Sequence, residues 1–217
     1  MTTPGSASRY EQKGKAAAYE ARNPARTRAE RALLSALLAR GGQPSSVRVP
    51  SILDAPCGTG RLYPWLAQDL KGAHYLGLDG SLAMLEQAQA KDIPAAFIQG
   101  DLQHLPLAER SFDLVVSFRF LHHLAKPEAA TALRQLARVT RRDLVLSAFH
   151  PWSAHHLSRK IQNWLQRRPL PRHAHSPRWI REQLAHQGLR EIERARMGHF
   201  RDLWVGLYRK SPPGLLD

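Results

Sequence analysis

Ser51-Ile-Leu-Asp-Ala-Pro-Cys-Gly-Thr-Gly-Arg61 is the stretch that decides the fold of this chain. A short apolar run ends in an acid, a loop of small residues follows, and residues 62–70 carry apolar side chains at helical spacing. A strand, a glycine loop and a helix in this order hold nucleotide-like ligands at the carboxyl end of the first strand of an open α/β sheet. Gly58 and Gly60 lack a Cβ, so the backbone can turn sharply and approach a ligand there.

The loop departs from the dinucleotide-binding fingerprint, which places a third glycine three residues after the second. That position is occupied by Tyr63, so the sequence does not favour close binding of a pyrophosphate. Asp54 lies four residues before Gly58. Its charge would repel a pyrophosphate and favour a cationic ligand, such as a sulfonium with its amino group. A nicotinamide dehydrogenase is therefore disfavoured.

The loop resembles the first motif of the class I S-adenosylmethionine (SAM)-dependent methyltransferases, in particular the small bacterial type that includes the quinone-biosynthesis C-methyltransferases. That motif commonly reads Asp-x-Gly-Cys-Gly-x-Gly, and this chain has Pro56 at its first glycine. Proline fixes φ and removes one N–H, so the loop geometry is expected to differ there. The resemblance implies that the following residues contact the cofactor: Asp54, Ala55, Pro56, Cys57, Gly58 and Gly60.

A second acid closes the next apolar run, residues 73–79, and Gly80 and Ser81 follow it. An acid at this place can accept hydrogen bonds from both ribose hydroxyls of a nucleoside. By resemblance, Asp79 and Gly80 belong to the SAM site. An acid before a helix is also favoured by the helix dipole alone, but the spacing from the glycine loop favours the ribose role.

A third strand-like run, residues 95–99, is followed by Gly100-Asp101-Leu102. In the resembling family, an acid here accepts from the adenine amino group and an adjacent backbone N–H meets the ring. A Gly-Asp pair also suits an ordinary turn. Residues 105–113 resemble the family's approach to its fourth strand, so four family-like segments follow one another in order.

The segment Ser117-Phe-Arg-Phe-Leu-His-His-Leu124 leaves the expected fourth strand toward the ligand side. The resembling family often has Leu-His-His here. We assign Ser117 and Phe118 to the cofactor site and Arg119 to the substrate side. Methyl transfer from a sulfonium is an in-line displacement, so alignment supplies most of the acceleration and a base serves only a protonated acceptor. The candidate bases are His122, His123 and His150, and a packing or capping role is equally open for each.

Strands alternating with helices predict a parallel α/β sheet with both faces covered. The resemblance implies a Rossmann-like, doubly wound sheet of seven strands in the order 3-2-1-4-5-7-6, with the last strand antiparallel. The strand-like runs are residues 51–55, 73–79, 95–99, 112–118, 143–149, 189–197 and 200–209. Helices are expected over residues 25–40, 62–70, 82–90, 127–139 and 177–187.

The 217 residues, 43% of them hydrophobic, fit a single domain. We expect a tail and helical cap over residues 1–44, a methyltransferase domain over residues 45–210, and a basic lid over residues 150–177. In the resembling family, an aromatic residue of the cap often closes over the cofactor. Tyr10 and Tyr19 are the candidates for that role, of which we assign Tyr19 to the cofactor site, although packing of an amphipathic helix on the sheet is the simpler explanation of either tyrosine.

Lysine and arginine total 32 against 18 acids, a formal net charge of +14. Such a charge favours anionic partners, and no acid occurs between residues 144 and 181. Basic residues interleaved with tryptophan suit an anionic small-molecule acceptor or RNA, but an amphipathic helix with a basic outer face explains the spacing equally. We assign Trp152, His155 and His156 to acceptor binding.

We predict a SAM-dependent methyltransferase that releases S-adenosylhomocysteine (SAH) and acts on a small molecule. An RNA-modifying enzyme and a non-catalytic SAM-binding scaffold stay open as alternatives.

Cys57 is the single cysteine, so an intrachain disulfide is excluded. Its place in the cofactor loop indicates a packed residue and not a nucleophile. An Asn/Asp-Pro-Pro-Tyr/Phe motif is absent, which disfavours amino-directed adenine or glutamine methylation. The histidines lack metal-ligand spacing, so no metal site is expected. Neither a signal sequence nor a membrane-spanning run occurs, so we expect a cytoplasmic protein. The acceptor atom and the oligomeric state stay open.

Overall fold

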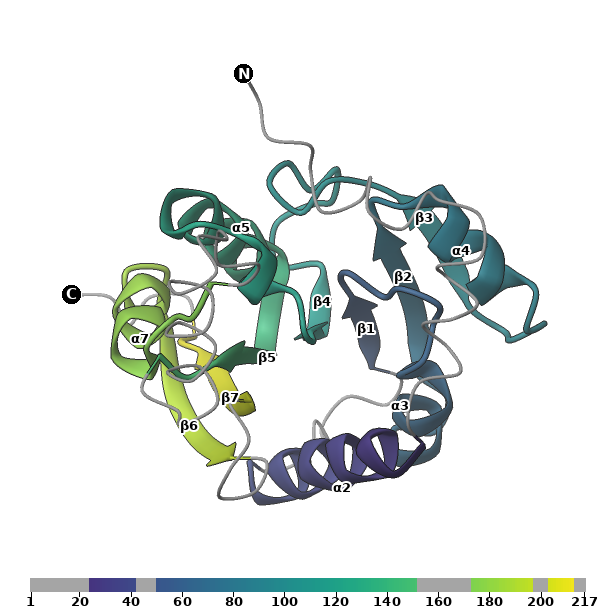
Figure 1. The fold of residues 1–217 in the computed structure, drawn as a ribbon, viewed down its shortest axis with the longest axis horizontal. Coiled ribbons are helices and arrows are strands. Elements are labelled where there is room, and N and C mark those ends of the chain that lie inside the picture. The colour runs from purple at the N-terminus through teal and green to yellow at the C-terminus, as the bar shows by residue number, and fades with distance from the viewer. Residues whose placement is uncertain (1–23, 42–49, 152–172, 197–202, 213–217) are drawn as a thin grey trace, which may run out of the picture.

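The computed structural model describes residues 24–41, 50–151, 173–196 and 203–212. These residues form a seven-stranded sheet with the order β3-β2-β1-β4-β5-β7-β6 (Figure 1). Strands β1 to β5 pair in parallel, and β7 runs antiparallel to β5 and to β6. The predicted fold class and strand order are confirmed. The strands are β1 Ser51–Asp54, β2 His74–Asp79, β3 Ala96–Gln99, β4 Phe112–Ser117, β5 Thr140–Phe149, β6 Leu189–Arg196 and β7 Leu203–Lys210.

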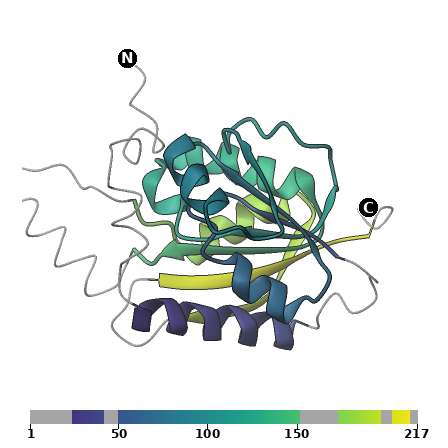
Figure 2. The ribbon, with the colours of Figure 1, turned by 90° about the vertical axis from the view of Figure 1, so that its right-hand side faces the viewer.

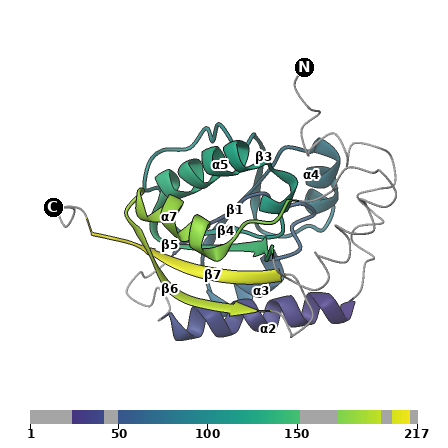
Figure 3. The ribbon, with the colours of Figure 1, turned by 60° about the vertical axis from the view of Figure 1, so that its left-hand side comes forward.

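Helices cover both faces of the sheet, as the alternating pattern predicts. In Figure 2, α2 and α3 lie below the sheet, and α5 and α7 lie above it. Figure 3 shows α2 running beneath β6 and β7. The helices are α2 Pro24–Arg40, α3 Tyr63–Asp69, α4 Leu82–Gln89, α5 Lys126–Val139 and α7 Pro177–Ala185, with a short 3₁₀ helix η2 Leu121–His123.

The strand β1 shows how the core is divided. Ile52 packs with Leu34 of α2 and Leu66 of α3, whereas Leu53 packs with Leu133 of α5 on the other face. All four of these leucine and isoleucine side chains of β1, α2 and α3 are almost completely buried. Because both faces are covered by helices, the loops at the carboxyl ends of the strands are the expected place for a ligand.

Asp113, at the start of β4, links neighbouring strands at their amino ends, which is the end of the sheet away from the glycine loop. Its Oδ2 accepts from the backbone N–H of Ser51 at 2.9 Å, and its Oδ1 accepts from the Arg141 guanidinium at 3.0 Å. Partial burial acts to raise the pKa of Asp113, but these bonds outweigh it and lower that pKa. The contacts join the first, fourth and fifth strands at the edge away from the glycine loop.

One local expectation was wrong. The strand β5 begins at Thr140 and not at residue 143, because the Arg141 guanidinium binds Asp113 and the carbonyls of Arg110 and Ser111, which hold this charged stretch extended. Ser81 lies at the N-cap position of α4, but its hydroxyl makes no capping bond. Its backbone N–H is instead donated to Asp79.

No helix within the described residues has the length and apolar character needed to cross a membrane.

Candidate functional site

The glycine loop connects β1 to α3 at the carboxyl edge of the sheet. Gly58 and Gly60 both have positive φ, +55° and +67°, a conformation that favours glycine. A Cβ built on Gly58 would meet no heavy atom within 4 Å among the described residues, whereas one on Gly60 would lie 3.3 Å from the Cβ of Ala88. Gly58 therefore leaves open space for a ligand, and Gly60 permits close packing on α4. The Ala55–Pro56 peptide in this loop is cis.

Asp79, at the end of β2, meets the glycine loop directly. Its Oδ2 accepts from the N–H of Gly58 at 2.8 Å, and its Oδ1 accepts from the N–H of Ser81 at 2.9 Å. Burial raises the pKa of Asp79, although the amides of Ser81, Gly58 and Gly80 act to lower it. The two motifs that the sequence singled out are therefore one site, with a carboxylate held beside the loop.

Asp54, at the end of β1, is completely buried beneath the same loop. Its Oδ2 accepts from the hydroxyl of Tyr75 at 2.6 Å, and its Oδ1 has no hydrogen-bond partner in the part of the chain described. Burial raises the pKa of Asp54 to about 7. A buried carboxyl with an unused oxygen is costly, and a cationic ligand group would stabilise its charged form.

Cys57 is packed, as the sequence indicates. Its backbone N–H donates to the carbonyl of Leu78 at 2.9 Å, and a Cβ built on Gly77 would lie 2.9 Å from its Sγ. Burial, together with the nearby carboxyl groups of Asp54 and Asp79, raises the pKa of the Cys57 thiol well above its ordinary value. The thiol is neutral and is unsuited to nucleophilic attack.

Gly100, Asp101 and Leu102 follow β3 beside Asp79. The N–H of Gly100 donates to the carbonyl of Asp79 at 3.0 Å, and Leu102 is buried. The exposed Asp101 accepts from the N–H of Gln103 at 2.9 Å, which is turn chemistry. The adenine-binding role of this segment stays a prediction.

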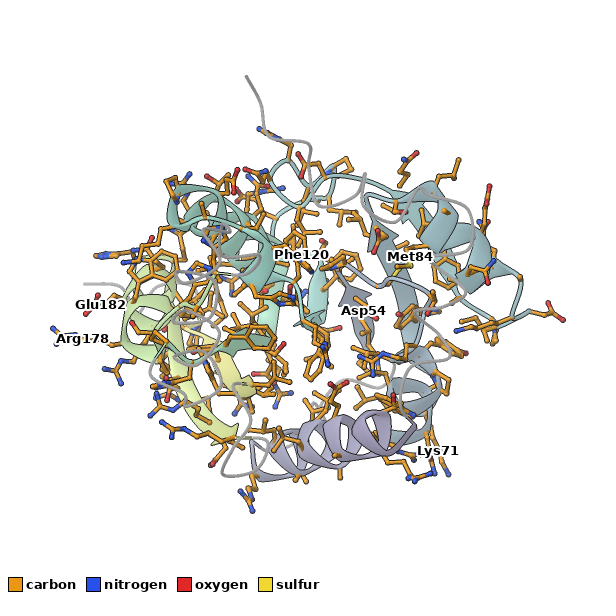
Figure 4. The ribbon with its side chains drawn as sticks, in the orientation of Figure 1. Asp54, Lys71, Met84, Phe120, Arg178 and Glu182 are labelled. Carbon is orange, nitrogen blue, oxygen red and sulfur yellow. The ribbon has the colours of Figure 1, made fainter. Side chains whose placement is uncertain are left out.

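The segment after β4 faces the glycine loop from the neighbouring strand. Ser117 and Phe118 are buried. Arg119 has a φ of +58°, and its N–H donates to the Ser147 hydroxyl at 2.7 Å. Figure 4 shows Asp54 and Phe120 toward the middle of the sheet, whereas the labelled ion pair of α7 lies at the outside.

The predicted histidines occupy different environments. His122 is 2% exposed, and its ring centroid lies 4.5 Å from that of Phe149 and 4.0 Å from that of His123. His123 is partly exposed, and His150 lies at the end of β5 with its Nε2 3.4 Å from a nitrogen of Arg196. The base role of each of the three stays a prediction.

His175, which the sequence reasoning treated only as part of the basic segment, is a buried structural residue. Its Nε2 lies 3.0 Å from the carbonyl of Leu121 and 3.1 Å from that of Leu124, so a neutral ring with its proton on Nε2 donates to both. Its ring stacks on Trp179. Burial lowers the pKa of His175. It holds η2 in place beside the site.

Three further residues at the site were missed. Tyr75 bonds Asp54, and Glu30 of α2 pairs with Arg61 of the glycine loop. A signal existed for two of them. Tyr75 places a hydroxyl beside the apolar residues that precede Asp79 in β2, and Glu30 is the single acid in the sequence of α2.

Several predicted site residues lie outside the described residues: Tyr19, Trp152, His155 and His156. The division into a cap, a methyltransferase domain and a lid likewise stays a prediction. Among the described residues, no group of three or more His, Cys, Asp or Glu side chains is placed to hold a metal ion.

Comparison with known proteins agrees with this geometry. Residues 52–143 match a family model described as a methyltransferase domain. The malonyl-[acyl-carrier protein] O-methyltransferase of Pseudescherichia vulneris is 34% identical over 103 residues, which are 42% of this chain and 40% of that protein. The trans-aconitate 2-methyltransferase of Deinococcus radiodurans is 38% identical over 111 residues, 51% of this chain and 41% of that protein. The matches thus span about two fifths of the length of these relatives.

A solved structure shares the fold. The magnesium protoporphyrin IX methyltransferase of Synechocystis PCC 6803, determined with bound SAH, superposes with a TM-score of 0.70 at 24% identity, over 85% of this chain and 84% of that one. The strand order and the motifs are those that the resemblance to the class I, Rossmann-like SAM-dependent methyltransferases implies, and the family model matches residues 52–143, less than half of the chain. Within this chain, residues 52–143 are the matched methyltransferase domain.

Proposed function

We propose that this protein transfers a methyl group from SAM to a small, anionic acceptor and releases SAH. The observation that carries the proposal is the unused, buried Oδ1 of Asp54 beneath the glycine loop. SAM and SAH each carry an ammonium group, and no cation among the described residues hydrogen-bonds this oxygen. The donor set therefore fits the proposed ligand.

The chain's own residues would bind the cofactor and orient it. Asp54 supplies negative charge for the ligand's ammonium, Gly58 permits close backbone approach, and Asp79 accepts hydrogen bonds from ribose hydroxyls. Bound SAM supplies a methyl group that is already activated by its positive sulfur. The protein therefore contributes mainly alignment and the exclusion of water. His123, which is partly exposed, is a candidate base for a protonated acceptor.

The anionic acceptor is supported by charge and by the relatives. The chain carries a formal net charge of +14, which raises the local concentration of anions. The relatives from Pseudescherichia vulneris and Deinococcus radiodurans are named for malonyl and trans-aconitate acceptors, both of which contain carboxyl groups. We infer that carboxylate compounds are the first acceptors to screen.

Calorimetric titration with SAH tests the cofactor site. We expect micromolar binding by the wild type, and loss of binding in Asp79→Ala and in Gly58→Val, whose side chain would enter the open space of the loop. Thermal melting of each variant checks that it is folded. Absence of SAH binding by the folded wild type would overturn the proposal. Binding without turnover on any acceptor would instead indicate a SAM-binding scaffold.

An RNA acceptor is a second candidate because of the excess of 32 basic over 18 acidic residues. An RNA-modifying enzyme should bind tRNA tightly, with an affinity that falls steeply as salt increases. Filter binding at several salt concentrations decides this point, and weak binding at physiological salt would leave the small-molecule acceptor.

A further inference from the structure

A buried ion network joins α2 to the proposed cofactor site. The side chain of Glu30 is 1% exposed, and its two oxygens accept from two different guanidinium groups. Oε2 lies 2.8 Å from Nη1 of Arg61, and Oε1 lies 2.7 Å from Nη1 of Arg119. Both arginine side chains are 17% exposed. Three segments that are distant in sequence therefore meet at one carboxylate.

The two arginines belong to the two loops that border the site. Arg61 directly follows Gly60 in the loop after β1, and Arg119 follows β4, which pairs with β1. Arg119 has a left-handed backbone with a φ of +58°, which residues with a Cβ seldom adopt. Its ion pair with Glu30 and the bond from its N–H to Ser147 hold it there. Such conformations persist only when the surroundings hold them, and they gather at functional sites.

Electrostatic interaction connects the Glu30 ion network to Asp54, the carboxyl group proposed to bind the ammonium of the cofactor. The positive charge of Arg61 acts to lower the pKa of Asp54, while the negative charge of Asp79 acts to raise it. Glu30 holds Arg61 in an ion pair of its own. Without Glu30, the two guanidinium groups would lose their shared partner, and Arg61 would be free to neutralise Asp54. An ammonium ligand would then compete with a residue of the chain for the same carboxylate.

We propose that Glu30 is a positioning residue that couples the docking of α2 to the ligand-binding form of the glycine loop. It does so by holding the Arg61 guanidinium in an ion pair, so that this group does not bond to Asp54. The inference rests on the proposed function, because it concerns the same cofactor site. It adds that α2, which lies outside the matched methyltransferase domain, controls that site through one side chain.

Glu30→Gln tests the coupling, and Glu193→Gln is its matched control. Glu193 of β6 lies 3.9 Å from Arg40 at the other end of α2, so the control loosens the same helix away from the site. By calorimetry at neutral pH, we expect Glu30→Gln to bind SAH at least roughly tenfold more weakly than the wild type, a usual size for coupling between two sites. Glu193→Gln should stay within about twofold, as expected of an exposed ion pair.

A double variant separates positioning from a loss of folding. In Glu30→Gln/Arg61→Gln, the freed guanidinium is absent, so SAH affinity should recover relative to Glu30→Gln alone. Additive losses in the two variants would overturn the inference, and so would wild-type affinity in Glu30→Gln. If Glu30→Gln does not fold, Glu30→Asp keeps the charge but cannot span both arginines, and it should show the same weakened binding at an intact melting transition.

Hydrogen exchange distinguishes failure of the coupling from failure of the proposed function. The amides of residues 57–61 should exchange faster in Glu30→Gln than in Glu193→Gln, with no ligand present. If the wild type binds no SAH, the proposed function falls and this exchange comparison decides the coupling by itself. Equal exchange in the two variants would overturn the coupling whether or not SAH binds.

Discussion

Binding of SAH should depend on pH through Asp54. The pKa of this carboxyl is raised to about 7 by burial, so near neutral pH about half of the ligand-free molecules carry a neutral Asp54. Only the ionised form attracts the ligand's ammonium. The apparent dissociation constant should therefore grow by the factor 1 + 10^(pKa − pH), which is about elevenfold at pH 6 and about hundredfold at pH 5.

The assay is calorimetry between roughly pH 5.5 and 7.5, where the α-amino group of the ligand stays largely protonated. Each titration is repeated in two buffers of different ionisation enthalpy, which reports the protons released on binding. With a pKa of about 7, about three quarters of Asp54 is protonated at pH 6.5. Binding there should release roughly that fraction of a proton.

Asp54→Asn is the control, since the amide oxygen can still accept from Tyr75 but cannot ionise. This variant should bind SAH weakly, without the pH dependence and without the release that Asp54 contributes. Protons taken up or released by groups other than Asp54 are common to both proteins and cancel in the difference. A wild type that binds SAH with the same affinity and the same proton release as Asp54→Asn across this range would refute the role of Asp54 as the ligand's counter-ion.

The remaining predictions concern stability and reactivity without ligand. Burial raises the folded pKa of Asp54 from its ordinary value of 3.8 to about 7, so the free energy of unfolding of the ligand-free wild type should fall as pH rises from about 4 to about 7. At pH 8, the free energy of unfolding of Asp54→Asn should exceed that of the wild type by up to about 4 kcal/mol. Because the pKa of His175 is lowered, its contribution to the stability of the fold is complete above about pH 6.5 and is lost on acidification. The free energy of unfolding in urea should therefore change less between pH 7.5 and pH 5.5 in His175→Gln than in the wild type. An equal change in the two proteins would contradict the buried neutral form of His175. The Cys57 thiol is buried with a raised pKa, so a thiol reagent should label it at least about a hundredfold faster in urea than in the native protein, and rapid native labelling would contradict the packed environment.

The fold could be predicted because its signals are local. Each of the first three strands is a short apolar run that ends at or just before an acid or a glycine, namely Asp54, Asp79 and Gly100, and each following helix has its own apolar spacing. The start of β5 at Thr140 was missed because its first residues are charged. The contact that extends them is with Asp113, 28 residues from Arg141 in the chain, and no local pattern contains it.

The candidate site likewise contains residues whose position follows from the local sequence and residues that only the folded chain brings together. The positions of Asp54, Gly58 and Asp79 could be predicted, because each lies at the carboxyl end of a strand or in the loop that follows it. Tyr75 and Glu30 act across elements, 21 and 31 residues away from Asp54 and Arg61. Burial also separates residues of one type, since His175 is buried whereas His173, two residues earlier, is exposed.

Global charge is a poor guide to this site. The chain carries a net charge of +14, yet its carboxyl edge gathers three buried acids, Asp54, Asp79 and Glu30, against the guanidinium groups of Arg61 and Arg119. An anionic acceptor approaches the basic surface as a whole, whereas a ligand inside the site meets both signs of charge within a few residues. SAH carries an ammonium and a carboxylate on one carbon, so a site of mixed charge suits it better than a uniformly basic one. In the arrangement that we propose, Glu30 occupies the guanidinium groups of Arg61 and Arg119 and so leaves the second oxygen of Asp54 available to the ligand.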